Sequence, residues 1–235
     1  MEKTKHIVIL ASGDFPSHPV PLQALREADF VVCCDSAYRE MKNEELRIKN
    51  YIVVGDGDSL SEQDKRQLGD RWLQVDEQDY NDLHKAMDWA TREFPISNSQ
   101  FSILGATGRR EDHTLGNISY LVTFAEEHPG ADIRMLTDHG LFLAFRGERT
   151  FATFPRQQIS IFTPDPATSV TSQGLRWPLD AMHPRLWWQA TLNESLGDSF
   201  SLHSDGWVIL FRTYDPKTVS AAPIPPTRCT EKDFC

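Results

Sequence analysis

Short apolar runs alternate with amphipathic segments through the first half of the chain. Four of the runs are brief and soon followed by Gly or Asp, which is typical of buried strands. They are Ile7–Leu10, Phe30–Cys34, Tyr51–Val54 and Phe101–Leu104. Strands of this kind, separated by helical segments, predict a mostly parallel sheet with helices on both faces.

The segments between these strands carry signals for the starts of helices. We expect four helices, opened by Pro21, by Ser61 with Asp64, by Asn81, and after Asp112. Proline suits the first turn of a helix, and Ser, Asp and Asn cap free N–H groups there. From Leu83 to Phe94 the apolar residues repeat at helical spacing, so one face of the third helix should be buried.

The second half of the chain has a different pattern, in which short strand-like runs follow one another and no helix is predicted. The runs are Asp132–Leu136, Leu141–Phe145, Arg149–Phe154, Gln158–Phe162, Trp187–Leu192, Ser199–His203 and Trp207–Arg212. Such spacing is typical of an antiparallel sandwich or small barrel.

The two patterns together predict a fold class and a division of the chain. We expect an α/β N-terminal domain with a mostly parallel sheet at residues 1–143, followed by an all-β sandwich domain at 144–214. The boundary should fall near Gly140–Gly147. Residues 215–235 contain four prolines and little apolar periodicity, which predicts a loosely held tail.

Composition narrows the classes of function. The 235 residues include 24 basic and 34 acidic side chains, a net charge of −10 that argues against a nucleic-acid or membrane partner. No apolar run approaches the roughly 18 residues of a membrane span, and Ile7–Leu10 is too short for a signal peptide. The four cysteines form no CxxC or zinc spacing, which favours reduced thiols and a cytoplasmic location.

Neither a P-loop nor a dinucleotide fingerprint occurs, but aspartates follow the predicted strands of the first half. These residues are Asp14, Asp35, Asp56, Asp58, Asp79, Asp82 and Asp112. In an open α/β sheet the carboxyl ends of the strands form the ligand-binding edge. The D-x-D turn at Asp56 and Asp58 suits Mg²⁺, which takes one or two carboxylates together with substrate phosphates. Asp also caps helices and starts turns, so each residue taken singly has a purely structural alternative.

A glycine-rich loop precedes the fourth predicted helix. Gly105–Gly108 reads G-A-T-G and offers backbone N–H groups that can hold phosphate. Arg109 and Arg110 follow it and can neutralise phosphate charge, although an exposed pair of arginines would look the same. The sequence therefore predicts an Mg²⁺-dependent enzyme that moves phosphoryl groups of a nucleotide.

Four motifs, taken in order, resemble the thiamine pyrophosphokinase family. They are G-D-G-D-S at 55–59, D-Y-N-D-L-H-K-A at 79–86, G-A-T-G-R-R-E-D-H-T-L-G-N at 105–117 and G-L-R-W-P-L at 174–179. The resemblance implies an ATP- and Mg²⁺-binding α/β domain, and a β-sandwich that supplies a thiamine pocket at a homodimer interface. It implies transfer of the β,γ-pyrophosphoryl group of ATP to thiamine, giving thiamine diphosphate and AMP.

The resemblance also implies roles for individual residues. Asp56, Asp58 and Asp82 would hold Mg²⁺ and act in catalysis, and Asp112 would orient or deprotonate the attacking hydroxyl. ATP would contact Asp35, Asp79, Lys85, Gly105, Thr107, Gly108, Arg109 and Arg110. Thiamine would contact Thr171, Ser172 and Trp177, with the indole stacked on the cationic ring system. The chain departs from the family pattern at Gly57, where an aromatic is usual, and at Arg109, which replaces a glycine.

Two other classes of function share some of these features. A metal-dependent phosphohydrolase also uses a D-x-D turn, but it needs no aromatic pocket in a second domain. A protein that binds thiamine without turnover would need no dense Mg²⁺ site. Trp177 itself can be a core residue, because six tryptophans occur and an indole in a β-sandwich is more often buried.

Overall fold

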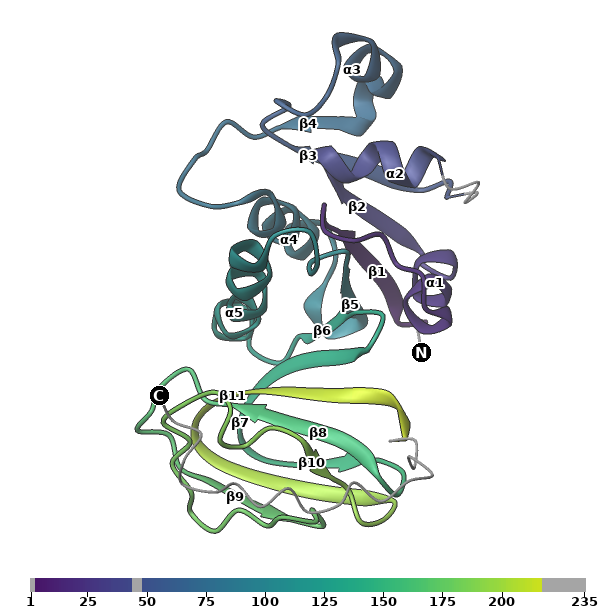
Figure 1. Cartoon of the computed structure of the whole chain (residues 1–235). Helices are drawn as coiled ribbons and strands as arrows, with labels where there is room; N and C mark the ends of the chain where they lie inside the picture. Colours follow the sequence, from purple (N-terminus) through teal and green to yellow (C-terminus); the bar gives the residue numbers. More distant parts are fainter. Residues whose placement is uncertain (1–2, 44–47, 217–235) are drawn as a thin grey trace, which may run out of the picture.

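A computed structural model describes residues 3–43 and 48–216 of the chain. All the strands in these residues belong to one 11-stranded sheet, in the order β10-β8-β11-β7-β6-β5-β1-β2-β3-β4, with β9 paired to β11. Helices flank the first half of this sheet, and the second half is entirely β (Figure 1). The predicted fold class, an α/β domain followed by an all-β domain, is therefore confirmed.

The first half is built around parallel strands. They are β1 (Lys5–Leu10), β2 (Phe30–Cys34), β3 (Tyr51–Gly55), β4 (Trp72–Gln74), β5 (Ser99–Leu104) and β6 (Asp132–Leu136). Pairing is parallel from β6 through β5, β1, β2 and β3 to β4. The four strands expected here from apolar runs are present, and all their carboxyl ends therefore lie at one edge of the sheet.

Helices bury their apolar faces on both sides of this sheet (Figure 1). The helices are α1 (Pro19–Arg26), α2 (Tyr38–Asn43), α3 (Glu62–Leu68), α4 (Asp82–Glu93) and α5 (Glu111–Glu127). On one side Met87 of α4 and Phe124 of α5 pack against Ile9 and Phe101. On the other side Leu25 of α1 packs with Val8 and Leu10. Alternate residues of one strand thus serve two cores, as the period-two geometry of a strand requires.

The predicted helix starts are confirmed to within two residues. Ser61 and Asp64 form a reciprocal capping box at α3, and the Asn81 side chain accepts a hydrogen bond from the backbone N–H of His84 at α4. The first helix begins at Pro19 rather than Pro21, because His18 supplies the cap. The short elements α2 and β4 were not predicted, since neither has enough residues to show a periodic pattern.

Strand β6 joins the two halves. It pairs in parallel with β5 and antiparallel with β7, so the sheet runs without a break into the β region. The β strands that follow are β7 (Gly140–Ala152), β8 (Gln157–Phe162), β9 (Val170–Gln173), β10 (Asn193–Glu194) and β11 (Ser199–Pro216). They pair antiparallel, with Phe151, Ile161 and Leu210 in their own core.

Several strand predictions in this half were wrong. Leu141–Phe145 and Arg149–Phe154 were expected as two strands but belong to the single strand β7, which continues through Gly147 at φ 80°. Ser199–His203 and Trp207–Arg212 likewise belong to β11, whose register shifts between Ser204 and Val208. A glycine and a bulge interrupt the apolar alternation without ending a strand.

The predicted strand Trp187–Leu192 is also wrong, because this segment consists mainly of turns. Trp187 and Trp188 are both exposed there. The short strands β9 and β10 were missed.

The predicted domain division at residue 143 falls within β7 and stays a prediction. The predicted tail begins inside β11, and its residues 217–235 lie outside the described part of the chain. None of the helices in residues 3–43 and 48–216 has the length and apolar character needed to span a bilayer.

Candidate active site

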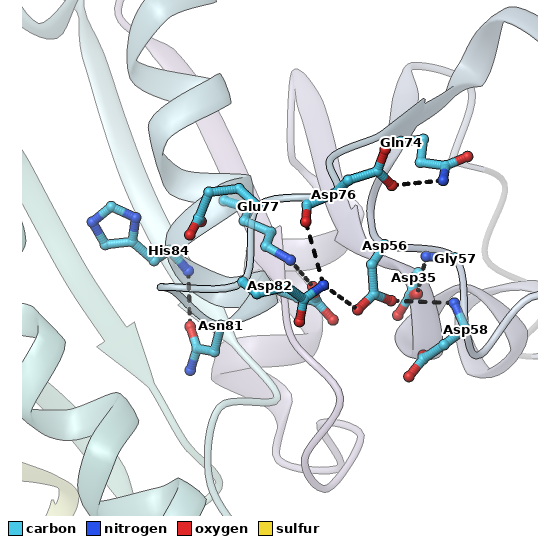
Figure 2. A network of polar contacts seen from close by, with 12 residues as sticks. Asp35, Asp56, Gly57, Asp58, Gln74, Asp76, Glu77, Asn81, Asp82 and His84 are labelled. Carbon is cyan, nitrogen blue, oxygen red and sulfur yellow. Dashed lines mark hydrogen bonds and ion pairs between the residues drawn. The ribbon is translucent and has the colours of Figure 1, made fainter.

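Three aspartates meet at the carboxyl edge of the parallel sheet. Asp35 follows β2 directly, and Asp56 and Asp58 follow β3 on the next turn. One carboxylate oxygen from each lies within 4.8 Å of the other two. Figure 2 shows this group gathered between the turn after β3 and the start of α4, where Asp82 also lies. The convergence expected from the parallel topology is therefore present.

Asp35 is the buried member of the group. Its side chain is fully buried, its Oδ2 accepts a hydrogen bond from the backbone N–H of Gly57 at 3.1 Å, and its Oδ1 has no hydrogen-bond partner. Burial, together with the charges of Asp56 and Asp58, raises the pKa of this carboxyl. A buried carboxylate oxygen without a donor is costly, and a cation beside it would offset that cost.

The turn that carries the other two carboxylates depends on Gly57. Its φ is +82°, and a Cβ atom there would lie 2.8 Å from the Trp72 ring. The backbone N–H of Asp58 donates to Asp56 Oδ1 at 3.2 Å, which lowers the pKa of Asp56 and keeps that carboxyl ionised. Glycine at the position where an aromatic is usual therefore lets the turn close tightly over Trp72.

Asp82 lies beside the three-carboxylate cluster, in the first turn of α4. Its Oδ1 is 3.5 Å from the ammonium of Lys85, whose side chain is 4% exposed. Burial, then the negative charge of Asp35, raises the pKa of Asp82 to about 6, and the attraction of Lys85 offsets only part of this rise. Like the pKa of Asp35, the pKa of Asp82 is thus raised above the usual aspartate value.

The donor set fits a hard divalent cation. The three converging groups are all carboxylates, and one of them has a buried oxygen that no protein donor satisfies. Mg²⁺ prefers oxygen ligands of this kind. Asp35 joins Asp56 and Asp58 in this cluster, and Asp82 lies beside it and pairs with Lys85, so the metal role of Asp82 stays a prediction.

The G-A-T-G loop packs against the loop that follows β1. The backbone N–H of Gly13 donates to the carbonyl of Gly105 at 2.5 Å, and that of Asp14 donates to the carbonyl of Thr107 at 2.8 Å. The N–H of Gly108 donates to the hydroxyl oxygen of Thr114 at 3.1 Å. These bonds fix the loop against the segment after β1 and the start of α5.

Arg109 has a backbone conformation unusual for its type, with φ 58°. Its guanidinium donates to the carbonyl of Ser12 at 3.0 Å, forms an ion pair with Glu40 of α2, and lies 4.0 Å from Asp14. Left-handed backbone is strained for a residue with a Cβ, and such strain gathers at functional sites. Arg109 thereby joins three separate segments at the edge of the sheet.

Arg110 and Asp112 form a separate, exposed pair. Arg110 donates to both carboxylate oxygens of Asp112, at 3.0 and 2.5 Å. This pairing lowers the pKa of Asp112 to about 2. A carboxylate held so firmly as an anion is a weak base, so the pairing favours the orienting role of Asp112 over the deprotonating one.

A cleft of about 350 Å³ connects these segments. Its walls include Ser12 and Gly13 after β1, Ser36 after β2, Asp82 of α4, and Arg109 from the G-A-T-G loop. Arg110, Gly108 and Cys34 also line it, whereas Asp79 lies exposed in the loop before α4. Of the residues expected to contact ATP, Gly108, Arg109 and Arg110 line this cleft, which Asp82 of the carboxylate group also lines, whereas Gly105 and Thr107 line a neighbouring cavity.

The residues expected to contact thiamine lie on β9 and just after it; β9 belongs to the β region, far along the sheet from β2 and β3, which the carboxylates follow (Figure 1). Trp177 is 50% exposed, and its backbone is held by the Asn193 side chain at 3.1 and 2.6 Å. Thr171 and Ser172 use their hydroxyl oxygens to accept backbone hydrogen bonds from Ala181 and Leu179. They hold the segment that carries Trp177, so the exposed indole is the accessible group of the three.

Sequence reasoning missed two residues of the carboxylate site. Glu40 pairs with Arg109, and the Gln78 amide lies 3.5 Å from Asp56 Oδ2. Neither residue belongs to one of the four motifs, and both reach the site from segments whose paths only the folded chain defines.

The comparisons with known proteins agree with this arrangement. A family model described as the catalytic domain of thiamin pyrophosphokinase matches residues 22–135. A second model, described as the substrate-binding domain of thiamin pyrophosphokinase, matches residues 140–211. The two models meet close to the start of β7.

Individual relatives carry the same name. Thiamine pyrophosphokinase 1 of Oryza sativa subsp. japonica is 34% identical over 151 residues, 57% of this chain and 54% of that protein. Thiamine pyrophosphokinase of Bacillus subtilis is 28% identical over 172 residues, 69% of this chain and 78% of that protein. The match thus spans about half the length of the rice relative.

Solved structures show the same fold. The crystal structure of the Bacillus subtilis thiamine pyrophosphokinase superposes with a TM-score of 0.73 at 25% identity, covering 90% of this chain and all of that one. The thiamin pyrophosphokinase from Candida albicans, at 17% identity, has a TM-score of 0.71 and covers 90% of each chain.

Proposed function

Because this chain belongs to the thiamin pyrophosphokinase family, we propose that it transfers the pyrophosphoryl group of ATP to thiamine and releases AMP. The observation that carries the proposal is the convergence of Asp35, Asp56 and Asp58 beside a cleft lined by glycines and arginines. Carboxylates alone would repel a polyphosphate, so this arrangement makes sense where a divalent cation lies between them.

We assign the cation site to Asp35, Asp56 and Asp58, with Asp82 next to them. Bound Mg²⁺ would neutralise charge on the phosphates of the nucleotide. Lys85 holds a buried positive charge at the same place, and Arg109 supplies a second at the mouth of the cleft. The protein's own contribution is to position the phosphates and balance their charge, which is the main requirement of phosphoryl transfer.

In the proposed reaction the hydroxyethyl oxygen of thiamine attacks the β-phosphorus of ATP. A new oxygen–phosphorus bond forms, and the bond from that phosphorus to the oxygen bridging it to the α-phosphate breaks. The hydroxyl proton passes to solvent, and AMP leaves with the bridging oxygen. Asp112, which Arg110 keeps in its anionic form, orients the incoming hydroxyl.

We propose that the acceptor site is completed in a homodimer. Trp177 follows β9 in the β region, whereas the carboxylates follow β2 and β3, and it lines a shallow pocket with Leu192, whose loop also exposes Leu186, Trp187 and Trp188. Exposed apolar side chains gathered in this way are typical of an interface. A second copy that covers this segment would bring the indole of one chain to the phosphate site of the other.

The two alternative functions explain fewer of these structural features. A phosphohydrolase needs no second domain with an exposed indole, and a thiamine sensor needs no cluster of carboxylates with an unsatisfied buried oxygen. A cytoplasmic location is part of the proposal, and the buried free thiols of Cys33 and Cys34 support it.

The test is to incubate the protein with ATP and Mg²⁺, with and without thiamine, and to measure AMP and thiamine diphosphate in the same sample. We expect equal amounts of both products, only with thiamine present, and neither with EDTA. Release of ADP or free phosphate without thiamine would instead support the phosphohydrolase. Thiamine binding with no AMP formed would support the sensor.

A further inference from the structure

Two aromatic rings stack at the start of α4, next to the carboxylate cluster. The imidazole of His84 and the phenol ring of Tyr80 lie with their centroids 4.0 Å apart and 12° between their planes. Tyr80 belongs to the loop between β4 and α4 and is 47% exposed. In Figure 2 the ring of His84 points away from the carboxylates, so it is not a ligand of the proposed metal site.

The neighbouring helix α5 holds the His84 ring in place. The ring centroids of Tyr120 and Phe124 lie 5.5 and 5.6 Å from that of His84. Nε2 of His84 lies 3.4 Å from a carboxylate oxygen of Glu127, the last residue of α5, and the His84 side chain is only 12% exposed. The imidazole is therefore a fixed surface on which the more exposed ring of Tyr80 packs.

The loop that carries Tyr80 reaches the carboxylate site on both sides of it. Before Tyr80, the side-chain amide of Gln78 donates to Asp56 Oδ2 at 3.5 Å. After it, Asp82 lies 3.5 Å from the ammonium of Lys85. The Tyr80–His84 stack thus anchors the middle of a short segment whose two ends meet the site.

Asn81, the residue after Tyr80, connects the same turn to the G-A-T-G loop. Its side-chain oxygen accepts from the backbone N–H of His84 at 3.0 Å, and its carbonyl accepts from the N–H of Lys85 at 3.1 Å. Its amide donates to Asn117 Oδ1 at 3.0 Å, and the Asn117 amide donates to the carbonyl of Ala106 at 2.8 Å. The cap of α4 and the stack therefore fix one turn, which lies between the carboxylates and the glycine loop.

We propose that Tyr80 and His84 are positioning residues for the metal site, and that their stack holds the loop before α4 in the conformation that binds Mg²⁺ and ATP. The inference rests on the proposed function, which places Mg²⁺ at the carboxylates. Without the stack, the ligands would have to order the loop themselves, which would weaken their binding. Once they are bound the loop is ordered in either case, so the maximal rate changes little.

The experiment separates the stack from the general stability of α4. Tyr80→Ser and His84→Leu remove the stack, whereas Tyr80→Phe and His84→Phe keep a ring at each position. Trp89→Leu is the matched control, because Trp89 lies on the same helix, is half-buried, and stacks on Phe30 instead. Thermal unfolding checks that each variant is folded. Amide hydrogen exchange at positions 84 and 85 reports the cap, calorimetry gives the affinity for Mg²⁺ alone, and steady-state kinetics give kcat and KM.

We expect Tyr80→Ser and His84→Leu to speed exchange, weaken Mg²⁺ binding and raise the KM for ATP, each by about three- to tenfold, the scale of one aromatic pair. Their kcat should stay within about twofold, and both Phe variants and Trp89→Leu should resemble the natural chain.

Unchanged exchange in folded His84→Leu would overturn the inference, as would faster exchange with unchanged Mg²⁺ affinity. An equal loss of Mg²⁺ affinity in Trp89→Leu would also overturn it, because general loosening of α4 would then be the cause. If the variants change Mg²⁺ binding as expected but the natural chain makes no thiamine diphosphate, the positioning role stands and the proposed function fails.

Discussion

The ammonium of Lys85 lies 3.5 Å from the carboxylate of Asp82, yet burial and the charge of Asp35 still raise the pKa of Asp82 to about 6. The single positive charge of Lys85 thus does not balance the negative charge of the surrounding carboxyl groups. The metal-free protein holds this imbalance in its folded state, and a bound divalent cation would relieve it.

The raised pKa predicts how stability depends on pH in the metal-free protein. The folded chain binds the Asp82 proton more tightly than the unfolded chain does, so the free energy of unfolding should fall as pH rises from about 4 to about 6. Asp82→Asn has no such proton and should lose this part of the slope. Urea unfolding in EDTA across this range measures it, and parallel curves for the two proteins would contradict the assignment.

Replacing Asp35 by Asn should separate stability from metal binding. The change removes a buried charge that two neighbouring carboxylates repel, while the amide oxygen can still accept from Gly57. We expect the metal-free variant to be at least as stable as the natural chain and to bind Mg²⁺ at least about tenfold more weakly. Calorimetric Mg²⁺ titration tests this, with the exposed Asp70→Asn as control. Undiminished Mg²⁺ affinity would remove Asp35 from the metal site.

Arg109 allows charge and backbone strain to be tested apart. Arg109→Gly and Arg109→Ala both remove the guanidinium, but only glycine adopts φ 58° without strain. The KM for ATP should rise about equally in both, by about tenfold, the scale of one charge-assisted contact. The Gly variant should be more stable than the Ala variant by about 1 kcal/mol in denaturant unfolding. An unchanged KM would leave Arg109 as a purely structural clamp.

The Arg110–Asp112 pair predicts the pH profile of the reaction. Asp112→Asn should lower kcat by about 10²-fold through lost orientation, a loss at the lower end of the range for a catalytic acid or base. Because the pKa of Asp112 is about 2, the substitution should leave the acidic limb of the profile where it is. If the variant loses or shifts an apparent pKa between about 5 and about 8, Asp112 is the base instead.

Replacing Trp177 should weaken the binding of thiamine and change little else. The side chain is 50% exposed, so Trp177→Ala should leave the unfolding midpoint nearly unchanged and raise the KM for thiamine by about tenfold. Trp188→Ala removes a tryptophan that is 70% exposed in the same region and is the matched control. Equal effects of the two changes on thiamine would point to a general interface role rather than a ring contact.

The sequence by itself predicted the elements whose signals are local. Buried strands such as Phe30–Cys34 were predicted because a short, wholly apolar run is typical of a strand covered on both faces. Ser61 and Asn81 were predicted because a cap forms its hydrogen bond within the first turn of its own helix. The sequence also predicted that the aspartates lie at one edge of the sheet, because parallel strands bring their carboxyl ends together. Motif order was enough to suggest the family.

The tertiary structure decided which of those side chains meet. Asp35 joined Asp56 and Asp58 while Asp82 turned to Lys85, and Glu40 reached Arg109 from a helix too short to predict. Strands β7 and β11 continued through a glycine and a bulge because their partners hold them along their length. These outcomes depend on loop paths and long-range pairing, in which residues far apart in the chain determine each other's position. The local pattern of the sequence carries no record of them.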